Sequence, residues 1–231
     1  MEMEMNNRSV HNDHTLDHEW LIEYAAGGLS LAKRVVIACQ AALNGDVHKR
    51  LRAAEEISAS FLETAHGDQV SGQFFDKLHD QLDASAQEYT DEIAERSRSS
   101  LLNADNRWAP GPLSKFIAEM GERFEWKSVG RIERAVLGDF DGDRLYLLKA
   151  RGGTKLPHHS HTGEEWTLVL QGGYHAGGVG FGPGDLHREG ADCHHQPIID
   201  AGEDCISLVA DEGRLRFSNP LLKAAQPFIG I

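Results

Sequence analysis

The spacing of apolar residues changes once along this chain, and the change separates a helix-forming part from a strand-forming part. From Asp17 to about Ile117, apolar residues recur every three or four positions, which predicts amphipathic helices. After Trp126 they alternate with polar residues in short runs, which predicts strands. We therefore expect an α+β fold, with a small all-α domain followed by a β-barrel or jelly roll.

The clearest boundary signal is the segment Trp108–Pro112, in which each proline removes a backbone donor and disfavours helix in the residue before it. We predict a helical domain over residues 14–100, a linker over 101–112 and a β-domain over 113–231.

Polar residues that can cap helices precede the apolar stretches of the first half. The expected helix starts are Asp17, Ser30, Asp46 and Ser71. The first two helices should end at Gly27–Gly28 and at Asn44–Gly45, where the chain can turn with positive φ. The third should bury an apolar face made of Val47, Leu51, Ala54, Ile57 and Phe61.

Gly/Asp turns separate the runs of the second half, and Asp141–Gly142 is typical of a hairpin. The predicted strands are Arg131–Leu137, Arg144–Ala150, Trp166–Leu170, Cys205–Ala210 and Arg214–Phe217.

Charge and cysteine content exclude several classes of protein. The 23 Lys+Arg and 36 Asp+Glu give a net charge of -13, which opposes direct binding of nucleic acid. Three cysteines with no close pair do not make a disulfide framework and suit a reducing compartment. No apolar run approaches the roughly 20 residues that span a bilayer, and no export signal is visible. We expect a cytoplasmic protein.

The residues with the clearest chemistry are histidines of the second half. His159 and His161 are two positions apart, so on a strand both imidazoles face the same side and can share one ion. Glu165 follows closely enough to add a carboxylate, and His195 is available from a distant strand. We predict one divalent metal ion at these residues. Zinc is the expected ion, with Fe, Mn, Ni and Cu compatible with the same ligand types.

Other residues near these positions are alternatives. His194 competes with His195, and Cys193 is a second neighbour that could donate a thiolate. Glu164 is the alternative to Glu165 but should lie on the opposite face of its strand. We expect His158, His175 and His187 to be exposed and without a role.

The spacing of these residues reproduces a known motif. Gly153, His159, His161, Glu165 and Gly172 are similar to the complete first signature of the cupins. The turn Gly182-Pro183-Gly184-Asp185 resembles part of the second signature, but His195 comes later than usual and the downstream Asn is missing. The resemblance implies a cupin barrel with metal ligands at His159, His161, Glu165 and His195.

The first half resembles the opening of the ChrR-type anti-sigma factors, in LIEYAAGGLS over Leu21–Ser30 and VVIA over Val35–Ala38. Two stretches of the second half are similar as well, GEEWTLVLQG over Gly163–Gly172 and HQP over His195–Pro197. The resemblance implies a helical domain that binds an extracytoplasmic-function (ECF) sigma factor, followed by a cupin domain.

The chain departs from this family at the zinc site of the helical domain. The family's His-x3-Cys-x2-Cys motif falls on Gln40, Asn44 and Val47, none of which is a good zinc ligand. Upstream histidines such as His14 and His18 remain. We expect no zinc in the helical domain, which must then fold on its apolar faces alone.

These observations favour a regulator of transcription over an enzyme. In this hypothesis the helices bind an ECF sigma factor, and the metal-binding cupin senses a small molecule or an oxidant in a stress response. The alternative is a metal-dependent cupin enzyme, of the dioxygenase or peroxide-processing type, with a vestigial helical domain. A stand-alone metal-binding homodimer is a third interpretation.

Overall fold

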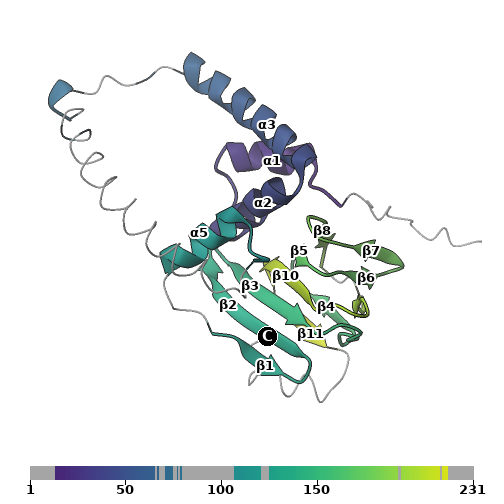
Figure 1. The fold of residues 1–231 in the computed structure, drawn as a ribbon. Coiled ribbons are helices and arrows are strands. Elements are labelled where there is room, and N and C mark those ends of the chain that lie inside the picture. The colour runs from purple at the N-terminus through teal and green to yellow at the C-terminus, as the bar shows by residue number, and fades with distance from the viewer. Residues whose placement is uncertain are drawn as a thin grey trace, which may run out of the picture.

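The structure of the protein is a computed structural model, and it describes residues 14–65, 67, 71–74, 77, 79, 107–120, 125–191, 194–213 and 215–217. The fold is α+β, as predicted: helices come first and pack on an antiparallel β-domain (Figure 1). The helices are α1 (His18–Ala25), α2 (Leu31–Leu43), α3 (Gly45–Thr64) and α5 (Gly111–Met120). Among the described residues, no helix is both long enough and apolar enough to span a membrane.

One of the predicted helix caps is confirmed and two are not. Asp17 precedes α1 as expected, but its side chain makes no capping hydrogen bond. The Ser30 hydroxyl accepts a hydrogen bond from the Lys33 amide and caps α2. We expected α3 to start at Asp46, but the helix starts at Gly45. The Asn44 side chain caps it by accepting hydrogen bonds from the backbone amides of Asp46 and Val47. Of the helix expected from Ser71, residues 72–74 are helical, and most of the remainder lies outside the described residues.

The β-domain is built from one large sheet and two small ones. The strands are β1 (Lys127–Val129), β2 (Ile132–Phe140), β3 (Asp143–Ala150), β4 (His159–His161), β5 (Glu165–Gln171), β6 (Tyr174–Ala176), β7 (Val179–Phe181), β8 (Leu186–Glu189), β9 (Ile198–Ile199), β10 (Cys205–Asp211) and β11 (Leu215–Phe217). The large sheet has six strands in the order β1-β2-β3-β10-β5-β8. Sheets β7-β6-β9 and β11-β4 complete the domain. Asp141 and Gly142 both have positive φ, which confirms the predicted hairpin turn.

The central strands β3, β10 and β5 of the six-stranded sheet are largely buried on both faces, whereas the edge strand β1 is exposed. The two faces of these central strands serve different cores. Leu145, Trp166 and Leu208 point toward the helices and share one hydrophobic cluster with Val36 and Leu113. Their neighbours along the same strands point the other way, into the interior of the β-domain. The helices therefore complete the core on one face of the sheet. The predicted domain limits stay a prediction, since residues 101–106 lie outside the described part.

Charged and aromatic side chains join the helices to the sheet. Trp20 of α1 meets Trp166 of β5 edge-on, with ring centroids 5.0 Å apart. Lys33 lies over Trp166 and Arg188 over Trp20, at 5.2 and 4.9 Å from the ring centroids. Glu164 accepts a hydrogen bond from Arg188 at 3.0 Å and lies 3.6 Å from the Lys33 ammonium. We call these five residues the helix–sheet interface.

The positions that match the family's zinc ligands have structural roles in this chain. Gln40 is fully buried, and its amide donates to the carbonyls of His14 and Gly184, at 2.9 and 3.2 Å. Asn44 caps α3, and Val47 is fully buried in the core. Helix packing and capping are therefore the observed roles of the three positions at which the resemblance implied zinc ligands.

Lys33 offers a test of how the two halves hold together. Its ammonium is largely buried among Glu212, Glu164 and Asp143. Burial acts to lower the pKa of this amine, but the hydrogen bond to Glu212 and the nearby carboxylates raise the pKa overall. Lys33→Met should lower the free energy of unfolding by about 3 kcal/mol, because it leaves partly buried carboxylates without their cation.

The matched control is Lys115→Met, since Lys115 is exposed on α5 and 3.9 Å from Glu119. This change should cost less than about 1 kcal/mol in urea denaturation of the full chain. Equal losses for the two variants would contradict a stabilising role for the buried ammonium.

Candidate metal centre

Three histidines from two segments meet inside the β-domain. His159 and His161 lie on β4, and both are buried, as is Ser160 between them. His195 pairs with His159 through two backbone hydrogen bonds of 3.2 Å, which places its ring beside β4. The three imidazoles each offer a nitrogen atom, and these atoms lie within 4.8 Å of one another.

The hydrogen bonds of His159 and His195 constrain which ring nitrogens carry protons. His159 Nδ1 lies 2.8 Å from the Pro157 carbonyl, which can only accept, so the proton of a neutral ring is on Nδ1. His159 Nε2 then holds a lone pair and faces His195 Nε2 at 2.7 Å. His195 Nδ1 is in close contact with the Glu189 carboxylate. If a neutral His195 donates from Nε2 to His159, its Nδ1 holds a lone pair that faces the Glu189 carboxylate. Two acceptors in contact repel each other, so a proton or a cation between them would be stabilising.

His161 is the residue of the site whose environment most clearly favours a bound cation. It is fully buried, and neither ring nitrogen has a hydrogen-bond partner among the described residues. Its Nδ1 lies 3.4 Å from a carboxylate oxygen of Glu165, and its Nε2 lies 3.8 Å from one of Glu189. Burial, with His159 and His187 nearby, lowers the pKa of His161 to about 4, so the ring is neutral at pH 7. A neutral buried imidazole with an available lone pair is a suitable metal ligand.

Glu165 begins β5 and supplies a buried carboxylate to the same site. Tyr146 and Thr167 donate hydrogen bonds to it, at 3.2 and 3.1 Å. Burial, together with the charges of Asp211 and Glu189, raises the pKa of Glu165 to about 8. A bound cation would favour the charged form of such a carboxylate.

A second carboxylate, Glu189, was not predicted from the sequence. It lies directly across from Glu165 in the β5–β8 pair, and it forms a possible ion-binding group with His161 and Glu165. The pairing register of β5 with β8 places Glu189 opposite Glu165. This register cannot be predicted from the spacing of neighbouring residues in the sequence. We call His159, His161, Glu165, Glu189 and His195 the histidine–carboxylate cluster.

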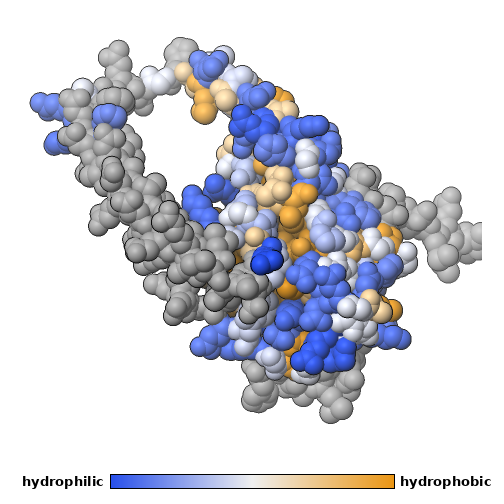
Figure 2. Space-filling model, viewed as in Figure 1, coloured by the Kyte–Doolittle hydropathy of each residue, from blue (hydrophilic) through white to orange (hydrophobic). Residues whose placement is uncertain are grey.

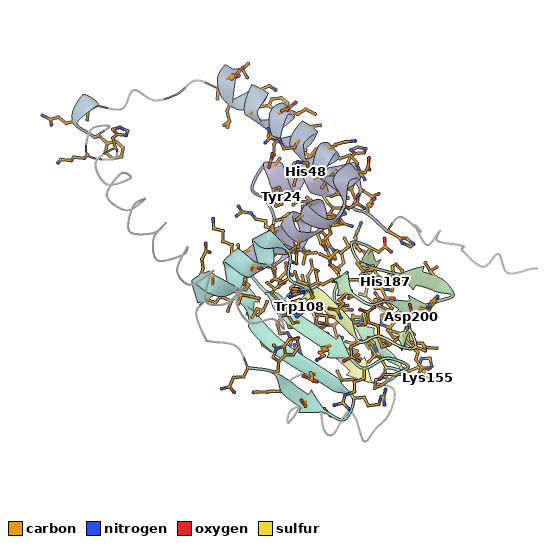
Figure 3. The ribbon with its side chains drawn as sticks, viewed as in Figure 1. Tyr24, His48, Trp108, Lys155, His187 and Asp200 are labelled. Atoms are coloured by element: carbon orange, nitrogen blue, oxygen red, sulfur yellow. The ribbon has the colours of Figure 1, made fainter. Side chains whose placement is uncertain are left out.

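The other histidines are distributed as follows. His158, His175 and His194 are exposed, and Cys193 lies outside the described residues. The expectation for His187 was wrong: it is only partly exposed, stacks on Phe181 and hydrogen-bonds to Tyr174 at 3.0 Å. Figure 3 shows His187 in the β-domain and His48 on the helices.

The carboxylates of Glu164 and Glu165 serve opposite faces of β5, as the alternation predicted. Glu164 accepts from the Trp166 indole at 2.9 Å and from Arg188, on the helix side. Glu165 is in the histidine–carboxylate cluster, which could hold a metal ion. Buried imidazoles with convergent carboxylates fit a divalent transition metal, and the unpartnered nitrogens of His161 are the observation that supports this fit.

Comparison with known proteins places the whole chain in one family. The family model described as the ChrR cupin-like domain matches residues 117–213. The anti-sigma-E factor ChrR of Cereibacter sphaeroides is 32% identical over 219 residues, which cover 94% of this chain and 98% of that protein. The crystal structure of Rhodobacter sphaeroides SigE in complex with the anti-sigma ChrR matches with a TM-score of 0.67 and 28% identity, over 86% of this chain and 98% of that chain. The chain belongs to the family of ChrR-type anti-sigma factors.

Proposed function

We propose that this protein is an anti-sigma factor whose hold on an ECF sigma factor depends on a metal ion in its cupin domain. The helices bind the sigma factor, and a small molecule or an oxidant that alters metal coordination releases it. The observation that carries this proposal is the placement of the histidine–carboxylate cluster and the helix–sheet interface on opposite sides of the same strands.

Similarity to a protein that is crystallised with its sigma factor supports the binding role. The helices also carry large apolar side chains that are exposed in the described part of the chain. Ile57, Phe61 and Leu62 of α3 have relative exposures of 52, 70 and 77%, so the predicted burial of Ile57 and Phe61 was wrong. Figure 2 shows hydrophobic groups at the surface of α3. Ile57 also lines a hollow between α1 and α3 together with Ile22. Large exposed apolar groups on one helix are typical of a protein–protein contact.

The packing of the helical half favours the regulator over the alternative of a cupin enzyme with a vestigial helical domain. Its residues complete the hydrophobic core on the outer face of the large sheet, where Trp166, Leu168 and Leu208 are fully buried. Removal of the helices would expose this face to water, which costs free energy. A signal that changes the sheet therefore acts directly on the helices.

For the metal, we propose His159, His161, Glu165 and His195 as ligands of one divalent ion, with zinc as the expected ion. Such an ion would supply positive charge among buried lone pairs. Pro157 orients His159 through Nδ1, and Tyr146 and Thr167 orient Glu165. Glu189 contacts His195 and orients it in the same way.

The route from the cluster to the helices is short. Glu165 and Glu189 of the cluster are each one residue away from Trp166 and Arg188, which pair with each other across β5 and β8. The turn before β8 also touches α2, because Gln40 donates to the Gly184 carbonyl. A change of coordination that shifts either strand would move groups on which α1 and α2 rest.

Loss of one central ligand should abolish metal binding. His161→Gln is expected to lower the metal content of the purified full chain from near one ion to a small fraction, because ligand removal costs much of the affinity of such a site. His158→Gln is the matched control, since His158 is exposed beside β4. Elemental analysis after dialysis gives the stoichiometry. Equal metal content in the two variants would contradict the proposed ligand set.

Apolar residues of α3 should contribute to sigma binding. The wild-type full chain is first tested against each purified ECF sigma factor of its own organism, and one of them should bind. Phe61→Ala combined with Leu62→Ala is then expected to weaken that complex about tenfold or more, because apolar anchors dominate such interfaces.

Ile198→Ala, at an exposed apolar residue on the β-domain, is the control and should leave the affinity unchanged. Failure of every sigma factor to bind would contradict the anti-sigma role. Binding that is insensitive to the α3 change would contradict the assigned surface.

A further inference from the structure

The interior of the β-domain contains a cavity of about 170 Å³ that reaches the histidine–carboxylate cluster. Its walls are largely apolar and include Leu148, Leu156, Ile199 and Val209, while His159, Glu165 and His195 also line it. We propose that this cavity binds a small monocarboxylate with an apolar body, and that the guanidinium of Arg134 binds the carboxylate group. This inference deepens the proposed sensory function by giving the chemical class of its ligand.

Arg134 brings a guanidinium group to this largely apolar cavity. It lies on β2, is 8% exposed and faces the cavity, while the next residue, Ala135, faces the helices. Its guanidinium carbon lies 4.1 Å from the centre of the Tyr146 ring. Burial lowers the pKa of Arg134 below its ordinary value, and this desolvation makes an additional negative charge favourable there.

A second cation lies beside it. Lys127 of β1 lines the same cavity and is paired directly with Arg134 in the sheet. Like charges that lie opposite each other on neighbouring strands destabilise a sheet. The protein has a net charge of -13, but these two cations together form a local positive region that suits an anion.

The class of anion follows from the shape of the cation and the size of the cavity. The planar fork of a guanidinium matches a carboxylate, and stacking on Tyr146 uses only the flat face of that fork. An apolar cavity of about 150 Å³ holds a benzene molecule. The cavity here is close to that size, so the apolar body should be an aromatic ring or a short branched chain.

Arg134 has another possible role, as a structural cation for the carboxylates of Asp211 and Glu165, whose charges act to raise its pKa. The two roles differ in what they predict for an added ligand. A purely structural Arg134 would leave the cavity equally receptive to charged and neutral molecules of one shape.

Benzoate and its neutral isostere benzamide are the probes, titrated by calorimetry into the full chain, both as purified and after removal of metal with a chelator. Benzoate should bind about tenfold or more tightly than benzamide in both preparations, because benzamide lacks the negative charge and the second acceptor oxygen that a guanidinium fork would bind. Arg134→Met should remove this preference. Arg151→Met, an exposed arginine at the end of β3, should retain it.

If Arg134→Met does not fold, Arg134→Lys tests the assigned role instead, because this variant keeps the positive charge but loses the planar guanidinium. It should bind benzoate more weakly than wild type and still prefer benzoate to benzamide. Equal affinities for the two probes in the wild-type chain would overturn the proposal. Benzoate binding that needs metal and ignores Arg134 would also overturn it, by making the metal the anchor. The titrations contain no sigma factor, so their failure is distinct from failure of the anti-sigma role.

Discussion

The coupling between the β-domain and the helices depends on one constraint, which is that the central strands of the six-stranded sheet are buried on both faces. Side chains alternate across a strand, so each residue of β5 and β8 must serve either the interior of the β-domain or the helices. Glu165 and Glu189 serve the interior, whereas Trp166 and Arg188 serve the helices. A sheet with one face in water would separate the proposed metal ligands from the helical half. This sheet places them one residue apart.

The same constraint explains how a helical domain without the family's zinc motif is held. Gln40, Asn44 and Val47 contribute a buried hydrogen bond, a helix cap and core packing. The remaining stabilisation comes from the shared core and from Lys33, which is held among carboxylates of the β-domain. Helices and sheet are therefore expected to unfold together, and a ligand in the β-domain interior can influence both.

Local patterns predicted the fold class, the hairpin at Asp141–Gly142 and the convergence of His159 with His161, because period and spacing are properties of short segments. They did not predict that Glu189 belongs to the histidine–carboxylate cluster, or that His187 and Arg134 line the adjoining cavity. These residues reach it through the register between strands, which depends on contacts distant in sequence. The exposure of Ile57 and Phe61 was missed for the same kind of reason, since an apolar face does not say which partner covers it.

The most direct test of the account measures the two binding equilibria together in the full chain. The affinity for the sigma factor is determined with metal-loaded and metal-free protein, and the affinity for metal is determined with and without the sigma factor. Coupling through β5 and β8 predicts tighter sigma binding by the loaded protein, by about fivefold or more, and an equal factor in the reciprocal experiment. Sigma binding that is identical with and without metal would contradict the account.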